Sequence, residues 1–392
     1  FSLLFLFHFL VGVGLSFFFM AGLQPGCRGV EDFEIVSQIG EGTYGRVYKA
    51  IDKATRQVVA LKVLIKFPEE EGISPVTVKE VKFLKLLRDV RGVVNLLDAF
   101  FSNDGEVVLV FEWMSNDLSG IIASFSPDRL SLRIIKCYLR QLFEALIDVH
   151  SRGLMHLDIK SANILLNDSG QLFLADLGFM THKDQPLRNN VVTRWYKPPE
   201  LLLGSTSYGP EVDMWGVGCV FFEMLTTCAP FPGDDEKDQL SRIMNLCGSE
   251  GLYQSPTLSS LPLANRARHI FPEPKPSRLR ERLQPLNLPC EALDLLCRLL
   301  SVDPADRLTA EEAFDHDFFY TGVDPARENE IPVFPFSVHE FEVSKRQQQR
   351  IALQRSLRIP SRINSTSCDN TRVAWKKESL SHSSSGRLYF HN

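Results

Sequence analysis

Two patterns of apolar positions divide this 392-residue chain into a strand-rich part and a helical part. Short apolar runs at 47–50 and 59–62 predict strands, whereas Val76–Leu87 carries apolar residues at helical spacing. After position 118, apolar residues recur at the spacing of amphipathic helices. Two such stretches are Leu132–His150 and Glu291–Leu300. The chain is therefore predicted to have an α+β fold, with a β-rich segment at 33–111 and a mainly helical segment at 118–320.

A glycine-rich segment lies between two of the predicted strands. Residues 40–47 read GEGTYGRV, and glycines let backbone N–H groups approach phosphates that side chains would keep away. A dinucleotide-binding fold would need a helix directly after these glycines. Because strand-like sequence follows instead, we predict a hairpin. Lys62, in the next strand, falls where a lysine grips the α- and β-phosphates, although a lone strand lysine is more often an edge residue.

Glu80 lies on the predicted helix Val76–Leu87, on a turn that could face Lys62. Phosphoryl-transfer enzymes of one large class need such a Lys–Glu pair to hold the lysine on the nucleotide. Any surface helix offers a glutamate, so Glu80 alone predicts only a solvated charge. Its significance comes from its place among the other motifs.

Two later segments carry the chemistry of phosphoryl transfer. Residues 156–163 read HLDIKSAN, in which Asp158 can accept a hydroxyl proton and Lys160 can hold the transferred phosphoryl group. Asn163 and Asp176, the first residue of a DLG turn, offer oxygen atoms to Mg²⁺. Each residue alone could be structural. Their fixed order indicates an enzyme that positions phosphates and neutralises their charge.

In this order the motifs resemble those of eukaryotic protein kinases of the cyclin-dependent family, over about residues 33–320. Residues 72–80, GISPVTVKE, resemble the helix by which that family binds a cyclin. Residues 191–200, VVTRWYKPPE, resemble its substrate-binding segment. The resemblance implies the two-lobed kinase fold, with a small lobe at 33–111, a hinge at 112–117 and a large lobe at 118–320.

Two further motifs of the resemblance lie in the predicted large lobe, DMWG at 213–216 and DPADR at 303–307. Kinases of this kind pair the glutamate found here at Glu200 with the arginine found here at Arg307. We expect a buried structural ion pair, which is costly to break from one side.

The resemblance implies a full set of site residues, with ATP and Mg²⁺ as cofactors. The metal ligands would be Asn163 and Asp176. The catalytic residues would be Lys62, Glu80, Asp158, Lys160 and Thr193. The residues around ATP would be Ile39, Gly40, Glu41, Gly42, Thr43, Tyr44, Gly45, Val47, Ala60, Lys62, Phe111, Glu112, Met114, Asp117 and Leu165. Among these, Phe111 would lie at the back of the adenine pocket, and backbone groups of Glu112 and Met114 would bind adenine.

Within the family, the chain is most similar to the transcription-elongation kinases that partner cyclin T or cyclin K. This likeness is carried by five segments: FEWMSNDL at 111–118, PPE at 198–200, DQL at 238–240, CGS at 247–249 and VHE at 338–340. The last resembles a C-terminal His-Glu that folds back beside the nucleotide. The likeness implies a nuclear kinase that binds a cyclin through Gly72–Glu80. It also implies Ser-Pro or Thr-Pro sites as substrates, above all the heptad repeats of RNA polymerase II.

The chain departs from the family pattern at the activation loop. Relatives normally clamp a phosphothreonine there with three arginines, and the corresponding positions of this chain read Leu157, Lys79 and Thr181. The phosphothreonine position itself reads Arg188, and 182–192 contains no Ser, Thr or Tyr. Each lost charge-assisted hydrogen bond would be worth roughly 1.5–3 kcal/mol. Either direct contacts and the cyclin order the loop, or the protein is inactive.

We favour the active kinase, because a pseudokinase would be expected to have lost at least one of the six charged or metal-binding site residues. Two alternatives stay open. One is a cell-cycle or kinase-activating kinase of the same fold, which would show no preference for heptad repeats. The other is a pseudokinase that holds a cyclin in an inactive complex.

Composition agrees with a globular enzyme that carries extensions at 1–32 and 321–392. The net charge of −5 names no partner, and the eight cysteines show no metal-binding spacing, as expected in a reducing compartment. Residues 1–23 are almost wholly apolar and long enough to span a bilayer, but no basic residue precedes them. We favour Met20 as the true start over a membrane anchor or signal, and even an anchored kinase domain would stay in the cytosol.

The C-terminal extension is basic. Residues 345–377 hold nine Lys and Arg against the single acidic residue Asp369, and the end is rich in serine. Such a run is usually a solvated, partly disordered tail. The sharper hypothesis is a nuclear-import signal or a nucleic-acid contact.

Overall fold

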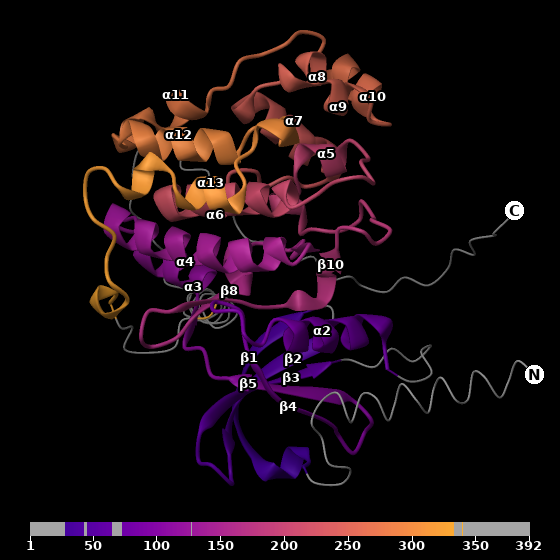
Figure 1. Ribbon diagram of the computed structural model, residues 1–392, viewed down its shortest axis with the longest axis vertical. Helices are drawn as coiled ribbons and strands as arrows, with labels where there is room; N and C mark the ends of the chain where they lie inside the picture. Colours follow the sequence, from indigo (N-terminus) through magenta and orange to yellow (C-terminus); the bar gives the residue numbers. More distant parts are fainter. Residues whose placement is uncertain (1–27, 43–44, 65–72, 127, 333–338, 340–392) are drawn as a thin grey trace, which may run out of the picture. The chain divides into compact units, whose positions relative to one another are not determined.

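The computed structural model describes residues 28–42, 45–64, 73–126, 128–332 and 339. The chain divides into two units, 1–348 and 349–392, and all described residues lie in the first. Within that unit, strands β1–β5 and helix α2 gather at one end, and the other helices stack beyond them (Figure 1).

Five strands form one antiparallel sheet in the order β1-β2-β3-β5-β4. They are β1 (Phe33–Gly42), β2 (Gly45–Asp52), β3 (Val58–Leu64), β4 (Leu96–Phe101) and β5 (Val107–Glu112). On one face of the sheet, Phe33 and Phe100 stack with ring centroids 5.6 Å apart inside a buried apolar cluster. Strands β1 and β2 pair up to Gly42 and Gly45 on either side of their turn. The hairpin predicted from the glycine segment is therefore confirmed.

Helix α2 (Pro75–Leu86) packs beside the sheet (Figure 1) and is the one α-helix among the described residues of the small lobe. The Ser74 hydroxyl accepts a hydrogen bond from the Val76 backbone N–H at 3.3 Å, and Pro75 has no N–H to leave unpaired in the first turn. These two residues start the helix one position before the predicted one. The buried face of α2 includes Glu80.

The large lobe is built mainly from helices. The longer ones are α3 (Leu118–Phe125), α4 (Leu132–Ser151), α6 (Glu211–Thr226), α7 (Glu236–Cys247) and α12 (Cys290–Leu299). The shorter ones are α5 (Pro199–Leu202), α8 (Gly251–Gln254), α9 (Pro256–Ser259), α10 (Ala264–Ile270), α11 (Leu279–Leu283) and α13 (Ala310–Phe314). Short strands are β6 (Asn116–Asp117), β7 (Leu154–Met155), β8 (Ile164–Leu166), β9 (Leu172–Leu174) and β10 (Thr181–His182). The predicted α+β class, with a strand-rich lobe and a larger helical lobe, is confirmed.

The described chain continues past the predicted end of the domain at 320. The Lys136 ammonium on α4 donates to the backbone oxygens of Thr321 at 2.6 Å and Val323 at 2.7 Å, and Ile331 is buried against the same lobe. Residues up to Ile331 therefore belong to the packed fold.

The predictions for the apolar stretch 1–23 and the basic run 345–377 fall outside the described residues. Across the ranges that are described, the structure contains no helix with both the length and the apolar character needed to cross a bilayer.

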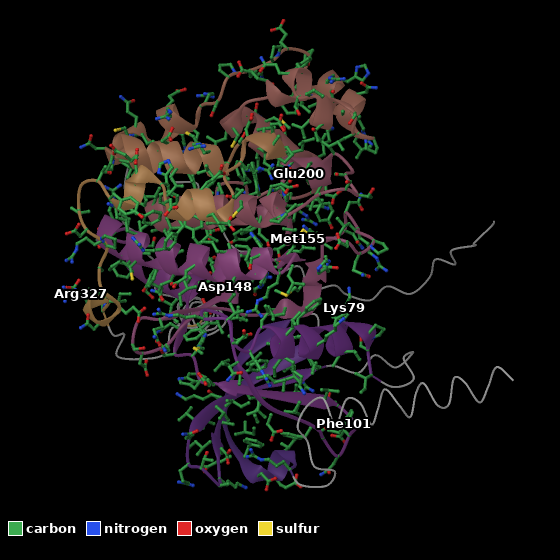
Figure 2. The ribbon with its side chains drawn as sticks, in the orientation of Figure 1. Lys79, Phe101, Asp148, Met155, Glu200 and Arg327 are labelled. Atoms are coloured by element: carbon green, nitrogen blue, oxygen red, sulfur yellow. The ribbon has the colours of Figure 1, made fainter. Side chains whose placement is uncertain are left out.

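A buried ion pair joins distant parts of the large lobe. The Arg307 guanidinium binds both carboxylate oxygens of Glu200, at 2.7 and 2.6 Å, and its side chain is 0% exposed. The same guanidinium stacks on Trp215, 5.0 Å from the ring centroid. Glu200, labelled in Figure 2, belongs to the short helix α5 that follows the substrate-binding segment. The expected pair is therefore present, and it fixes the end of that segment to the lobe.

We predict that Arg307→Met lowers the free energy of unfolding by roughly 3–5 kcal/mol, because it leaves the Glu200 carboxylate buried without its partner. Urea unfolding of the purified chain measures this loss. The matched control is Arg278→Met, which removes an arginine from an exposed pair with Glu281 and should have a far smaller effect. Equal losses in the two variants would contradict a structural role for the buried pair.

Candidate functional site

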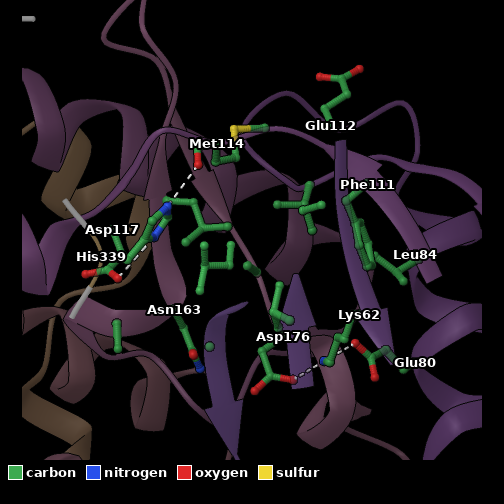
Figure 3. A pocket seen from close by; sticks show the side chains of 18 residues that line it. Lys62, Glu80, Leu84, Phe111, Glu112, Met114, Asp117, Asn163, Asp176 and His339 are labelled. Atoms are coloured by element: carbon green, nitrogen blue, oxygen red, sulfur yellow. Dashed lines mark hydrogen bonds and ion pairs between the residues drawn. The ribbon is translucent and has the colours of Figure 1, made fainter. Parts of the chain in front are cut away.

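A cavity of about 240 Å³ lies between the sheet and the large lobe. Its lining combines apolar side chains with a few polar ones that converge from different elements (Figure 3). The lining residues are Ile39, Gly40, Val47, Ala60, Lys62, Glu80, Leu84, Val94, Phe111, Glu112, Met114, Asp117, Ala162, Asn163, Leu165, Ala175, Asp176 and His339. An apolar cleft with few polar groups is the usual form of a cofactor site.

Lys62 connects three elements at one end of this cavity. Residues alternate in direction along a strand, so Ala60 and Lys62 of β3 face the same side. The Lys62 ammonium binds the Glu80 carboxylate at 2.7 Å and the Asp176 carboxylate at 2.9 Å (Figure 3). Strand β3, helix α2 and the turn after β9 are thereby held in one arrangement.

The charges around Lys62 set the protonation of the cluster. Burial opposes the ammonium charge, but the Glu80 and Asp176 carboxylates outweigh burial and raise the pKa of Lys62. The ammonium in turn lowers the pKa of Asp176, although burial works against this shift. For Glu80, burial raises the pKa and Lys62 opposes the rise. Asp176 therefore stays ionised at neutral pH and can bind a cation.

A second hydrogen-bonded set surrounds Asp158. Its Oδ2 accepts hydrogen bonds from the Lys160 ammonium at 2.7 Å and the Asn163 amide at 2.9 Å. Its Oδ1 accepts from the Thr193 hydroxyl at 2.6 Å and from the Thr193 backbone N–H at 3.0 Å. The Thr193 hydroxyl also accepts from Lys160 at 3.0 Å. The predicted catalytic residues of this segment thus lie within hydrogen-bonding distance of one another.

The buried Asp213 carboxylate of α6 holds the backbone that leads into Asp158. It accepts the backbone N–H groups of His156 and Leu157, each at 2.8 Å, and contacts the His150 ring at 2.9 Å. Burial would raise the pKa of Asp213, but the hydrogen bonds from His150 and the backbone outweigh burial and lower it. The ionised carboxylate keeps Leu157 in the left-handed region, at φ 63°.

The Leu157 side chain is 1% exposed and belongs to an apolar group that we name the Leu157 cluster. Its buried members are Met155, Leu157, Leu201 and Val212. Partly buried residues packed against them are Phe179, Leu187, Val191, Val192 and Tyr208. Most of these packed residues belong to the segment 179–192. Where relatives are expected to carry an arginine clamp, this chain therefore packs the segment on leucine.

The other two clamp positions also lack the expected arrangement. Thr181 is buried in β10, where it pairs with Met155 of β7. Lys79 lies on α2 and is exposed (Figure 2). Arg188 is exposed, and its backbone oxygen accepts the Tyr208 hydroxyl at 2.6 Å. This hydrogen bond adds a polar contact to the apolar packing of the segment.

The residues present fit a magnesium–nucleotide complex. Asn163 and Asp176 both line the cavity, and amide and carboxylate oxygens are suitable Mg²⁺ ligands. Among the described residues, no group of three His, Cys, Asp or Glu side chains could hold a metal ion unaided. Mg²⁺ usually takes one or two protein ligands and completes its shell with phosphates and water.

His339 occupies the opposite end of the cavity, beside the hinge. Its Nε2–H donates to the backbone oxygen of Met114 at 3.1 Å, and its Nδ1 lies 3.4 Å from Asp117 (Figure 3). Its ring packs edge-on against Trp113, with centroids 5.6 Å apart. The predicted fold-back of the C-terminal His is thus seen for His339. It binds the backbone oxygen of Met114, a residue whose backbone groups were expected to bind adenine.

Most predicted nucleotide residues line the cavity, with clear exceptions at the glycine hairpin. Glu41 is exposed and does not line the cavity, and Gly45 pairs with Leu64 in the sheet. Gly42 ends β1 outside the cavity lining, and residues 43–44 fall outside the described residues.

Sequence reasoning missed part of the lining, namely Leu84, Val94, Ala162 and Ala175. In the sequence these four residues look like any other apolar core position. Only the three-dimensional fold brings them to the cavity.

Comparisons with known proteins agree with this geometry. The chain matches the protein kinase domain over residues 33–319. It is 38% identical over 344 residues to cyclin-dependent kinase C-1 of Oryza sativa subsp. japonica. The aligned residues cover 83% of this chain and 65% of that protein. It is also 38% identical over 328 residues to CTD kinase subunit alpha of Schizosaccharomyces pombe. The aligned residues cover 81% of this chain and 54% of that protein.

A third relative is matched over almost its full length. Cyclin-dependent kinase B2-2 of Arabidopsis thaliana is 37% identical over 308 residues, which cover 76% of this chain and 96% of that protein. The chain spans less than two thirds of the length of the rice and fission-yeast proteins. From the domain match and these relatives, the chain belongs to the protein kinase family and, within it, to the cyclin-dependent kinases.

Proposed function

We propose that this chain is the catalytic subunit of a cyclin-dependent Ser/Thr kinase that transfers the γ-phosphate of ATP to Ser-Pro and Thr-Pro sites. The observation that carries the proposal is the joint assembly of two sets of residues. One set places Lys62 between Glu80 and Asp176. The other places Lys160 and Thr193 on the Asp158 carboxylate. A pseudokinase would have no need to keep both sets in order.

The geometry around Asp158 suggests how a substrate would be activated. The Thr193 hydroxyl donates to Asp158 Oδ1 at 2.6 Å, and a substrate hydroxyl at that place would pass its proton to the same oxygen. Lys160 and Asn163 bind Oδ2 and so hold the carboxylate in one orientation. Bound ATP with Mg²⁺ would supply the phosphoryl group, with Asn163 and Asp176 as metal ligands and Lys62 on the phosphates.

Val192 supports a preference for proline after the phosphoacceptor. Its φ of 69° is left-handed, which is strained for a β-branched residue and costs on the order of 1–3 kcal/mol. Such a turn would direct the backbone beside Thr193 away from an extended peptide, which would then find no carbonyl partner there. Proline has no N–H that would be left unpaired. We therefore infer that Val192 favours Ser-Pro and Thr-Pro over other sites.

The cyclin would bind the exposed side of α2. Val76 and Leu86 of α2 are 37% and 47% exposed, and Leu97 of the neighbouring strand β4 is 46% exposed. Exposed apolar side chains on these neighbouring elements would fit a protein interface. Binding there would hold Glu80 against Lys62. Of the expected cyclin segment Gly72–Glu80, the structure describes residues from Ile73 onward.

We further infer that the cyclin is of the T or K type and that the main substrate is the heptad repeat of RNA polymerase II, which places the kinase in the nucleus. The match to CTD kinase subunit alpha of fission yeast supports this inference. The seat of His339 beside Met114 supports it as well, because a C-terminal His-Glu of this kind is expected in the cyclin K type.

Activation-loop order in this kinase would not depend on phosphorylation. The segment 182–192 has no hydroxyl to phosphorylate, and the Leu157 cluster packs Leu187 and Val191 without any phosphate. The Tyr208 hydroxyl adds a hydrogen bond to the Arg188 backbone. Full burial of one apolar side chain contributes about 1.5–3 kcal/mol, and Leu187, Val191 and Val192 are partly buried, so together they offset about one or two of the missing charged contacts.

We expect residues 20–392 together with a cyclin T or cyclin K to transfer phosphate from labelled ATP to a Tyr-Ser-Pro-Thr-Ser-Pro-Ser repeat peptide. Asp158→Asn should lower kcat by at least about 100-fold, because it removes the proton acceptor. A repeat peptide in which alanine replaces both prolines tests the proline preference. If the complex binds the cyclin and Mg-ATP but transfers no phosphate to any Ser/Thr peptide, the chain has a binding role instead.

We also expect Tyr208→Phe to lower kcat/KM for the peptide by about 2- to 12-fold, because it removes one hydrogen bond from the activation segment. The matched control is Tyr253→Phe, since Tyr253 likewise donates to a backbone oxygen, that of Phe271, far from the site. Steady-state kinetics and thermal unfolding of both variants separate positioning from stability. If both variants lose activity equally, Tyr208 has no special part in loop order.

A further inference from the structure

Two exposed arginines flank Thr193, the residue that marks the phosphoacceptor seat. Arg194 follows Thr193 directly, and Arg188 lies five positions before it. Among the described residues, neither guanidinium makes an ion pair with a carboxylate. The mechanism proposed above uses neither of them. Both are exposed and lie within five residues of Thr193 along the chain, so their charges call for a separate explanation.

The backbone of Arg188 is held on both sides. Leu187 and Val191 pack into the Leu157 cluster, and the Tyr208 hydroxyl binds the Arg188 oxygen at 2.6 Å. The neighbours of Arg188 are anchored, so its backbone is held in place. Its side chain is exposed, so its positive charge is accessible to a bound substrate. Five residues of chain place its Cα within about 18 Å of the Cα of Thr193. An extended substrate of about five residues covers the same distance.

The side chain of Arg194 is more restricted than that of Arg188, because it is hydrogen-bonded. Its Nη1 donates to the backbone oxygen of Asp234 at 2.5 Å, beside the acidic start of α7. Two nearby carboxylates have other partners, because Asp235 caps α7 and Glu236 pairs with Lys197 at 2.6 Å. Arg194 keeps its charge at the seat, but the acidic surroundings weaken its field. We therefore expect Arg188 to contribute more than Arg194.

We propose that Arg188, assisted by Arg194, selects substrates with an anionic side chain within about five residues of the phosphoacceptor. The proposal rests on the proposed kinase function and adds a substrate class to it. The planar guanidinium binds carboxylates and phosphates through paired hydrogen bonds, and a phosphate carries more charge than a carboxylate. Phosphoserine is thus the strongest ligand of this class. In a substrate with repeated Ser-Pro sites, each product would then become a better substrate for the next transfer.

The experiment compares Ser-Pro peptides that have a single phosphoacceptor, using the cyclin-bound kinase. One series carries phosphoserine at each position from five before to five after the acceptor, a second carries glutamate there, and a third carries unmodified alanine. We expect kcat/KM to rise about fivefold or more at one or two positions with phosphoserine, and less with glutamate. The preference should fall as salt is raised from low to high concentration, because the arginines are exposed.

Charge reversal identifies the residues responsible. Arg188→Glu should abolish or invert the ratio between the phosphoserine and alanine peptides, and Arg194→Glu should reduce that ratio less. The matched control is Lys183→Glu, which makes the same charge change at an exposed position of the same segment, farther from Thr193 along the chain. In the control the ratio should stay as in the parent kinase.

The outcomes separate the two proposals. Equal transfer to all three series would overturn the anion preference while leaving the kinase function intact. A preference that persists in Arg188→Glu and Arg194→Glu would also overturn it, because the anion would then bind elsewhere. Absence of transfer to every peptide would contradict the proposed function itself, and the anion preference would fall with it.

Discussion

The catalytic loop depends on one buried carboxylate, that of Asp213. It binds two successive backbone N–H groups, those of His156 and Leu157, and so fixes the chain just before Asp158. An ionised, fully buried carboxylate is stable only when it is hydrogen-bonded, and here the bonds are supplied by the loop that it positions. The left-handed turn at Leu157 follows from this binding. Its result is that the carboxylate of the next residue faces Thr193 while the leucine faces the activation segment.

Two kinds of force hold the two sides of the site. Lys62 is held by charges, because two carboxylates outweigh the cost of its burial. The activation segment is held by apolar packing on Leu157 and by the hydrogen bond from Tyr208. A phosphate clamp can be added or removed by enzymes, whereas a packed cluster is permanent. The activity of this kinase would therefore be regulated by cyclin binding and by the position of His339 beside Met114, rather than by phosphorylation of the activation segment.

The sequence predicted the fold class and most of the cavity lining, because glycine spacing, strand alternation and the order of charged motifs are local patterns. It also predicted the contact between Lys62 and Glu80 from their place in that order. It did not predict what replaces the clamp, since Tyr208 and Leu187 meet Leu157 only in three dimensions and are ordinary apolar or aromatic residues in the sequence. The sequence analysis placed Glu41 at the nucleotide, whereas the structure shows it exposed. A glycine motif predicts a loop but does not indicate which of its residues face inward.

The central claim is that this kinase works with an activation segment that carries no phosphate. The most direct measurement is the peptide transfer rate of the cyclin complex before and after phosphatase treatment, with mass spectrometry of the peptide that contains residues 176–200. The account predicts an unmodified peptide and an unchanged rate. Loss of activity on phosphatase treatment, restored by renewed phosphorylation within that peptide, would contradict it.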